Sequence, residues 1–488
     1  MIGKAALLLG IAVALASAAI DINPSRPLLF GTHRIIPQLG NNAESNHTAI
    51  WNTVNLRQGY TNPQNTGSFP MRYVMNNQYY RRGGPIFLFI GGPWTLEAHY
   101  VEQGHFVDIA AALNGFLVAN ELRYYGESKP LENISRNNLR YLHNVHILSE
   151  LAMFIAHIKE EVVQDPSAKV ILAGVGYSAS LAQWMRQRFP HLVDGVWSSS
   201  GIVQTSSDFR AFTEEVGQII RRFGGNDCYN TIWSGFRTVE NLIDIGISNQ
   251  LDQLFNTCEP INATNSLDVQ AFFYGIFYEI SLEVVNKDLQ ENIRRLCEPL
   301  TDPDQENSLL ALAGWLKNRF PSAVCLSMDF QTIVDTYAPI NWESEIVESG
   351  ERQWLFQRCT ELGWPITTTS QYQPFGQRFS TELFHGICER LFDSWLTRDK
   401  FEELTAQTND FYGGSRPEIR NSIFTHGGLD PWRFAGVRAI RSPNTYVNVI
   451  PNAVHGQDLA SISAEDSDEL RRSKEMVTNT IRRWVNSN

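Results

Sequence analysis

The sequence predicts an α/β fold in which a mostly parallel sheet is interrupted by a large helical insertion. Up to about residue 205, short apolar runs that end in glycine alternate with segments of helical periodicity. The strand pattern then fades, and all six cysteines lie between Cys228 and Cys388. A strand pattern returns near residue 421, so we expect the C-terminal part of the chain to complete the sheet.

The first half of the expected core follows in order along the chain. Apolar strands are predicted at 85–90, 115–120, 169–173 and 193–198. Helical periodicity over 147–163 stops before Pro166, and a second helix over 180–189 stops at Pro190. Gly91 and Gly92 follow the first strand and predict a tight loop there. Strand, helix, strand, helix, strand is the pattern of a parallel sheet.

The middle of the chain is predicted to be mainly helical. One apolar face runs from Phe209 to Phe223, and further helical stretches are expected near 231–256, 267–297, 306–319 and 379–407. Strands at 421–425 and 445–450 and a charged amphipathic helix over 467–485 complete the chain. The expected domains are therefore a core in two parts, 19–205 and 418–488, separated by a disulfide-stapled helical cap over 206–417.

The N-terminus has the features of a secretory signal peptide. Lys4 precedes an apolar run over 5–15, and Ala16-Ser17-Ala18 is a small-residue cleavage site, so we expect residues 1–18 to be removed. A buried N-terminal helix is the alternative. Glycosylation acceptors at Asn46, Asn133 and Asn262 also favour a secreted, extracellular or lysosomal protein.

Composition narrows the possible partners. The chain of 488 residues is long for one compact core, and its formal charge of −12 disfavours nucleic acid and anionic membranes as partners.

An even number of cysteines in an oxidising compartment predicts three disulfides, for which sequence alone allows fifteen connectivities. No C-x-x-C pair is present, and His143 and His146 have no evident third ligand, so we expect no metal and no cofactor.

The junction at 170–189 carries the first candidate site residue. A strand that turns sharply into a helix is the nucleophile elbow of α/β-hydrolases, where the pattern is G-x-S-x-G. Here the stretch is Gly174-Val175-Gly176-Tyr177-Ser178, so the small flanking residues are present and the centre is Gly176. The backbone N–H of Tyr177, with that of Gly92 or its neighbour, is the candidate oxyanion hole.

Two acid–base candidates follow the last two predicted strands. Asp430 lies in the segment 427–432 and His455 in the segment 452–458. Elbow, then Asp, then His is the order of the α/β-hydrolase triad, in which Asp orients the imidazole that takes the serine proton. Without a nucleophile, a merely structural pairing of Asp430 and His455 is equally compatible with the sequence.

Nearly the whole chain resembles the prolylcarboxypeptidase and dipeptidyl peptidase II family of serine exopeptidases, which includes thymus-specific serine protease. The resemblance is carried by residues 84–92, 121–126, 174–184, 188–193, 353–363, 429–432 and 453–455. It implies an α/β-hydrolase core with a helical cap, cleavage next to proline, and Asp430 and His455 as triad members. It also implies the disulfides Cys228–Cys297, Cys258–Cys325 and Cys359–Cys388.

Three positions depart from the family pattern at the expected rim of the active site. Gly176 replaces serine, Pro93 replaces glutamate, and Leu122 replaces histidine. Glycine has no Oγ, so no acyl-enzyme can form. Ser178 and Ser180 lie too far around the turn to face His455.

The resulting hypothesis is a secreted, inactive member of the family that binds peptides. An active exopeptidase with another nucleophile and a structural or storage glycoprotein are the alternatives. A peptide or protein ligand and a homodimer are compatible with the sequence. Glu121, Arg123, Tyr124 and Tyr125 are interpreted as a structural network. Glu361 is also interpreted as structural, with binding of a peptide amine as its alternative.

Overall fold

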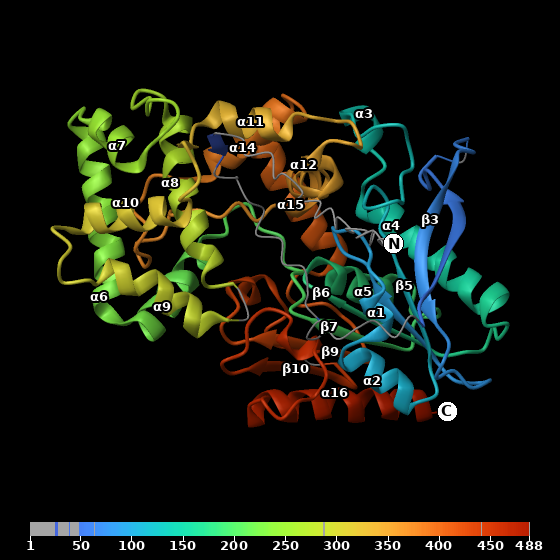
Figure 1. Ribbon diagram of the computed structural model, residues 1–488. Coiled ribbons are helices and arrows are strands. Elements are labelled where there is room, and N and C mark those ends of the chain that lie inside the picture. Colours follow the sequence, from blue (N-terminus) through green and yellow to red (C-terminus); the bar gives the residue numbers. More distant parts are fainter. Residues whose placement is uncertain are drawn as a thin grey trace, which may run out of the picture.

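A computed structural model describes residues 25–27, 39, 48–62, 64–285, 288–440 and 442–487. The predicted signal peptide and Asn46 lie outside the described residues. The main sheet has eight strands in the order β10-β9-β7-β6-β4-β5-β3-β2 (Figure 1). Their bounds are β2 (Ile50–Arg57), β3 (Ser68–Asn76), β4 (Ile86–Ile90), β5 (Phe116–Asn120), β6 (Val170–Val175), β7 (Gly195–Ser199), β9 (Ser422–Gly427) and β10 (Thr445–Ile450).

The six strands from β10 to β5 are parallel, as the sequence predicts. Strands β4, β5, β6, β7 and β9 are buried along their whole length. This burial explains why β4, β5 and β6 appear in the sequence as nearly continuous apolar runs, whereas β7 and β9 also bury Ser, Thr and His side chains. The hairpin β2–β3 is antiparallel and was not predicted. Strand β2 is mostly exposed at the sheet edge and carries polar residues between its apolar ones, so it lacks the signal of a buried strand.

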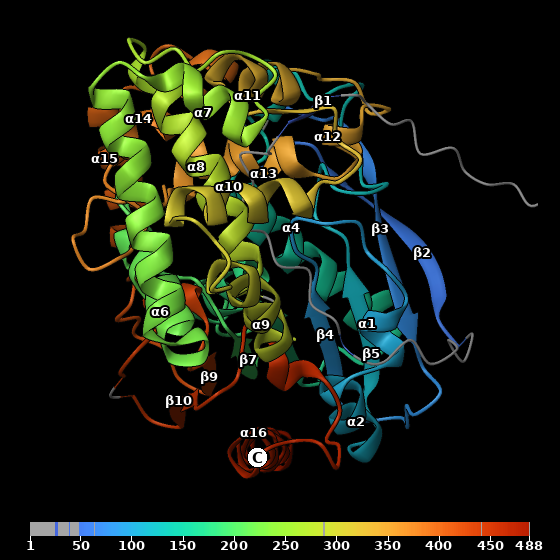
Figure 2. The same cartoon turned by 60° about the vertical axis from the view of Figure 1, so that its left-hand side comes forward.

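Helices cover both faces of this sheet. Helices α2 (His105–Ala112) and α16 (Asp468–Asn486) pack on one face, and Figure 2 shows α16 end-on beneath the strands. Helices α4 (Asn144–His157) and α5 (Tyr177–Arg188) pack on the other face. Short helices α1 (His99–Glu102) and α3 (Arg136–Leu139) lie in the connections. Alternate side chains of β4 enter the two hydrophobic clusters, Ile86 and Leu88 on one side and Phe87 and Phe89 on the other.

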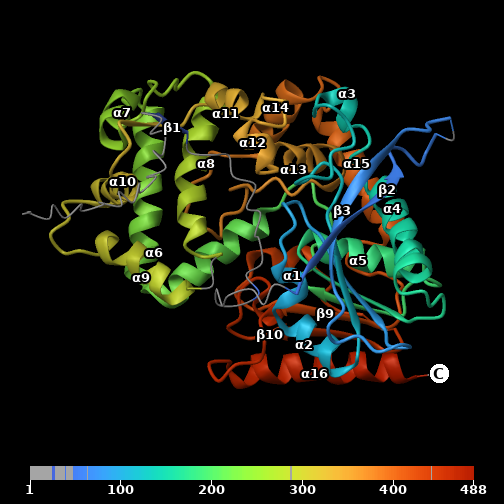
Figure 3. The same ribbon diagram turned by 45° about the vertical axis from the view of Figure 1, so that its right-hand side comes forward.

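The chain between β7 and β9 forms the helical region that we call the cap (Figure 3). Its helices are α6 (Arg210–Asp244), α7 (Ser248–Phe255), α8 (Ser266–Leu282), α9 (Leu289–Leu300), α10 (Ser308–Arg319), α11 (Phe330–Tyr337), α12 (Glu345–Glu348), α13 (Glu351–Gln357), α14 (Thr381–Leu391) and α15 (Arg398–Tyr412). A π-helical turn, Arg358–Leu362, continues α13. The expected helix end at Gly224–Gly225 is present within α6, because Gly225 has a non-helical backbone with a φ of 83° and a ψ of 175°, and a second helix begins beyond it.

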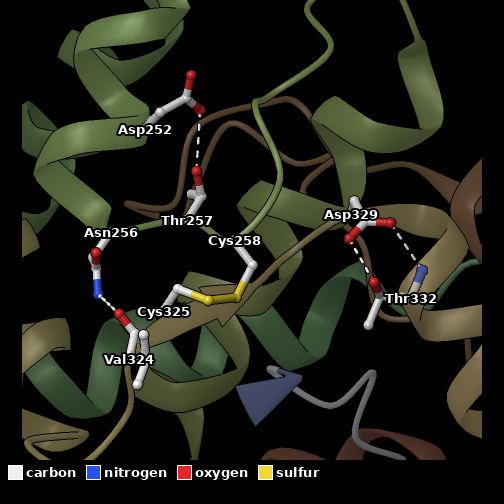
Figure 4. Close-up of a disulfide and its surroundings, with 8 residues drawn as sticks. All are labelled: Asp252, Asn256, Thr257, Cys258, Val324, Cys325, Asp329 and Thr332. Atoms are coloured by element: carbon white, nitrogen blue, oxygen red, sulfur yellow. Dashed lines mark hydrogen bonds between the residues drawn. A yellow bond between two sulfur atoms is a disulfide. The ribbon is translucent and has the colours of Figure 1, made fainter. Parts of the chain in front are cut away.

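Three disulfides staple the cap, with the pairing that the resemblance implies. They join Cys228 to Cys297, Cys258 to Cys325, and Cys359 to Cys388. Figure 4 shows the second one, with the Asn256 side chain donating to the carbonyl of Val324 beside it. No described cysteine is free.

One short element crosses the expected boundary between core and cap. Strand β1 (Ser25–Pro27) pairs in parallel with β8 (Cys325–Ser327), which lies in the cap. The first part of the predicted core therefore includes a piece that adds to the cap. Strands of three residues are too short for periodicity to reveal. Among the described residues, no helix is both long and apolar enough to cross a membrane.

Candidate active site

Gly176 forms the turn between β6 and α5, with a φ of 57° and a ψ of −120°. This backbone conformation strains any residue with a Cβ, and it is the kind of strain found at nucleophile elbows. The strand and the helix approach so closely that a Cβ on Gly174 would lie 2.6 Å from the backbone of Ser178. The turn therefore has the elbow geometry that the sequence predicts, with glycine at its centre.

Asp430 and His455 are brought together by adjacent parallel strands. Strands β9 and β10 end side by side, with Ile450 paired to Gly427, and the Leu429 N–H donates to the Ala453 carbonyl at 2.9 Å. The buried Asp430 carboxylate accepts from the Trp432 N–H at 2.9 Å through one oxygen. Its other oxygen lies 2.8 Å from His455 Nδ1.

The imidazole of His455 faces Gly176. A Cβ built on Gly176 would lie 3.2 Å from His455 Nε2 and 3.6 Å from Cε1, and apart from the adjoining residues Val175 and Tyr177 no other described residue comes within 4 Å of it. A real side chain at Gly176 would displace the imidazole by a few tenths of an ångström. With its Nδ1–H bound to Asp430, His455 presents Nε2 as a proton acceptor in its neutral form and as a donor in its charged form.

Two backbone amides are placed as the candidate oxyanion hole. Tyr177 is the first residue of α5, so its N–H is among those that no helix carbonyl can satisfy. Phe89 of β4 pairs with Ala173 of β6, which brings the following loop with Gly92 beside the elbow. Among the described residues, neither the Tyr177 N–H nor the Gly92 N–H donates a hydrogen bond.

The side chain of Tyr177 fixes the elbow from the other side. Its buried hydroxyl donates to Asn144 Oδ1 at 2.6 Å and accepts from Gln357 Nε2 at 2.8 Å. The Tyr125 hydroxyl donates to the amide oxygen of the same Gln357 at 2.6 Å. Burial raises the pKa of Tyr177 well above its ordinary value, so the phenol stays neutral. These contacts connect the elbow to α4, to the loop after β5 and to α13 of the cap.

Ser178 and Ser180 are both buried and engaged elsewhere. The Ser178 hydroxyl bonds to the backbone of Val175, accepting from its N–H at 2.9 Å and lying 3.1 Å from its carbonyl. The Ser180 hydroxyl donates to the Ile202 carbonyl at 2.8 Å. Neither hydroxyl bonds to His455.

The residues of segment 121–126 form a network within the fold. The buried Glu121 carboxylate accepts from the side chain of Arg72, the Leu96 N–H and the Ser128 N–H. Arg123 pairs with the buried Glu150. Leu122, expected at the rim of the active site, is buried in the hydrophobic core with Tyr124 and Tyr125. These contacts agree with the structural interpretation of the segment.

Glu361 is held by the start of α4. One carboxylate oxygen accepts from the Asn144 N–H at 2.9 Å, and the other lies 2.8 Å from His143 Nδ1. This engagement supports the structural interpretation of Glu361. The neighbouring His146 accepts from the Tyr60 N–H at 3.0 Å. No group of three or more His, Cys, Asp or Glu side chains with the arrangement of a metal site occurs among the described residues.

His146 is expected to make the fold less stable in acid. Burial, with the positive charges of Arg123 and His143, lowers the pKa of His146 to about 4. The ordinary pKa of histidine is about 6.5, so between pH 6.5 and 4 this position binds more protons in the unfolded chain than in the folded one. The stability that depends on neutral His146 is therefore fully present above pH 6.5 and is lost as the pH falls toward 4. The contribution reaches up to about 3 kcal/mol. His146→Asn, which keeps an acceptor for Tyr60, is expected to remove most of this loss.

Urea unfolding at pH 7.0 and pH 4.5 measures this effect. The natural protein is expected to lose about 2 kcal/mol more than the His146→Asn variant between the two pH values. His191→Asn, at an exposed histidine, serves as the matched control and is expected to follow the natural protein. An equal loss in the natural protein and in His146→Asn would contradict the assignment.

Several residues around the site were not predicted from the sequence. His426, at the end of β9, is buried and lies 2.9 Å through Nε2 from the Val437 carbonyl, and burial lowers its pKa. Asp458 accepts from the Ser199 hydroxyl at 2.6 Å, and the Ser200 hydroxyl accepts from the Gly456 N–H at 3.0 Å. These bonds fasten the loop of His455 to the end of β7. Separations of more than 250 residues leave no signal for such pairs in a single sequence.

The fold and the site together define an α/β-hydrolase. A mostly parallel sheet carries a strand–turn–helix elbow, and the loops after the last two strands bring an Asp–His pair to face it. The family described as serine carboxypeptidase S28 matches residues 60–477. The chain belongs to this family.

Individual relatives align with this chain over most of their length. Thymus-specific serine protease of Mus musculus is 29% identical over 442 residues, which cover 87% of this chain and 85% of that protein. Lysosomal Pro-X carboxypeptidase of Mus musculus is 25% identical over a match that covers 86% of this chain and 85% of that protein. Among solved structures, a proline iminopeptidase of Mycobacterium smegmatis is 10% identical to this chain. The match covers 89% of this chain and 99% of the iminopeptidase chain, with a TM-score of 0.37, and we base no argument on it.

Proposed function

We propose that this protein is a secreted pseudopeptidase that binds peptides at a peptidase site and does not turn them over. One observation carries the proposal: the position that faces His455 Nε2 is Gly176, and no hydroxyl lies within 4 Å of the place where its Cβ would be. A serine peptidase needs an oxygen nucleophile there to form the acyl-enzyme. The Asp430–His455 pair, the elbow and the two free amides would remain as a binding site.

The alternative of an active exopeptidase requires another nucleophile. Ser178 and Ser180 are the nearest candidates in sequence, and their hydroxyls are directed to the backbone of Val175 and Ile202. Removal of a triad member from other serine peptidases costs on the order of 10⁶ in rate. Family membership favours proline-directed peptidase chemistry in general, and the glycine at 176 argues against it here.

The alternative of a structural or storage glycoprotein assigns no ligand to the site. Against it stands the Asp430–His455 pair, which has a 2.8 Å contact and faces the elbow, as the hydrolase triad requires. A protein with a purely structural role has no need for an imidazole nitrogen directed at a glycine. The ligand we propose is a peptide, and the site gives no reason to expect a nucleic acid.

Export is proposed on three grounds. The N-terminal pattern is that of a signal peptide, the cap holds three disulfides, and the relatives include a lysosomal Pro-X carboxypeptidase and a probable extracellular serine carboxypeptidase. Of the two described acceptors for glycosylation, Asn262 is exposed, with its side-chain oxygen bound to the Thr264 hydroxyl. Asn133 is half-buried and accepts from the Asn138 side chain. Asn262 is therefore the stronger candidate.

Covalent labelling tests the proposal. The secreted protein and its Gly176→Ser variant are treated with a fluorophosphonate, and intact masses are measured. We expect the label only on the variant, because the Asp430–His455 pair would then activate the new hydroxyl. A label on the natural protein at Ser178 or Ser180 would show an active enzyme and overturn the proposal. A variant that remains unlabelled would show that the site has lost more than its oxygen.

A further inference from the structure

We infer that the site binds a free carboxylate, namely the C-terminal end of a peptide. One carboxylate oxygen would bond to His455 Nε2 in the space that a serine hydroxyl would otherwise fill. The second oxygen would accept from the backbone amides of Tyr177 and Gly92. This inference rests on the proposed function and names the chemical group that the site selects.

The imidazole of His455 supplies the first observation. Its side chain is only 5% exposed, and Nδ1 is bound to the fully buried Asp430. Nε2 forms no hydrogen bond with any described residue, although it lies 3.2 Å from the Cβ position of Gly176. Nε2 is not a fully buried unpaired atom, so it is accessible to a partner from outside the chain.

The start of α5 supplies the second observation. The helix has 12 residues, and its first N–H, that of Tyr177, donates to no described acceptor, and neither does the N–H of Gly92. The N-terminus of a helix favours negative charge through its dipole and its free amides. The Tyr177 amide thus directly follows Gly176, which His455 Nε2 faces, and the loop with Gly92 follows the strand next to β6.

A carboxylate satisfies all of these groups, whereas an internal peptide bond does not. The carbonyl of a peptide bond has one oxygen, which would occupy the amides and leave Nε2 without a partner. A carboxylate has two oxygens, and a charged His455 between it and Asp430 would form charge-assisted hydrogen bonds to both. With serine at position 176, Oγ would take the place of the oxygen beside Nε2. The loss of the nucleophile therefore converts a site for cleaving peptide bonds into one for holding free peptide ends.

A pair of small peptides tests the inference. N-acetyl-alanyl-proline and its C-terminal amide are titrated into the natural secreted protein by calorimetry, with proline chosen because the family includes a Pro-X carboxypeptidase. We expect the acid to bind at least tenfold more tightly than the amide. Acetate, titrated in parallel, is expected to bind far more weakly than the peptide acid, because it lacks the peptide portion.

Two variants locate the preference. His455→Ala removes Nε2, and Gly176→Ser keeps the imidazole but places a hydroxyl where the carboxylate oxygen would lie. Both are expected to lose the tenfold preference for the acid. His191→Ala, at an exposed histidine outside the site, is the matched control and is expected to retain it.

Equal binding of acid and amide, binding of neither, or a preference that survives both variants would overturn the inference. Acetate that binds as tightly as the peptide acid would overturn the peptide part of it. Fluorophosphonate labelling of Gly176→Ser separates this failure from that of the proposed function. A labelled variant without any acid preference removes the carboxylate inference alone, and an unlabelled variant challenges the peptidase site itself.

Discussion

The Gly176→Ser variant is expected to hydrolyse a prolyl peptide at least about 10³-fold faster than the natural protein. Deletion of triad members from serine peptidases costs on the order of 10⁶, so restoring the missing oxygen recovers part of that factor. The elbow already has the strained backbone, and apart from its chain neighbours only His455, among the described residues, lies within 4 Å of the new Cβ. Full recovery is not expected, because the imidazole must shift slightly and Pro93 replaces the family's glutamate.

Release of a chromogenic group from an alanyl-prolyl substrate measures this gain. Gly176→Ala carries the same Cβ without an oxygen and is expected to stay at the natural protein's rate. Adding Asp430→Asn to Gly176→Ser is expected to remove most of this gain, because the imidazole would then favour the wrong tautomer. Equal rates in Gly176→Ser and Gly176→Ala would show that the pair facing the elbow cannot activate a hydroxyl.

The sequence was sufficient to predict those parts of the site that directly follow a strand along the chain. The elbow follows from a strand pattern that meets a helix pattern at small residues, and Asp430 and His455 each follow a recognisable strand. Because β9 and β10 are adjacent and parallel, loops at the same ends must meet. The mostly exposed β2 was missed, because its alternation of polar and apolar residues falls outside the pattern of a buried strand.

The supports of the elbow could not be predicted in this way. Tyr177 is bound by Asn144 and by Gln357, which lie 33 and 180 residues away along the chain. No local pattern encodes such contacts, because they depend on how the cap packs on the core. The resemblance placed segment 353–363 among the matching pieces, but only the structure assigns Gln357 its partners. The cap therefore helps to hold the elbow, which is a role beyond covering the site.

Arg123→Met is expected to lower the free energy of unfolding by about 3–5 kcal/mol. The guanidinium of Arg123 is fully buried and bonds to Glu150 Oε2 at 2.7 Å through Nε. It also donates to the carbonyls of Arg57, Gln58 and Tyr141. Without Arg123, the buried carboxylate of Glu150 has no compensating charge. Burial already raises the pKa of Glu150 in the natural protein, so the variant is expected to hold this group protonated.

Urea unfolding at pH 7 distinguishes a buried charge from simple loss of packing. Adding Glu150→Leu to Arg123→Met is expected to recover part of the stability, because the buried, unpaired carboxyl group is removed while three backbone carbonyls still lack their donor. Arg294→Met is the matched control. Its exposed pairs with Glu291 and Glu298 predict a change within about 0.5 kcal/mol. A double variant no more stable than Arg123→Met would assign the whole loss to the carbonyls. Arg123 would then act through the strand ends it joins, and the loop that carries Tyr125 toward Gln357 would depend on those bonds rather than on the ion pair.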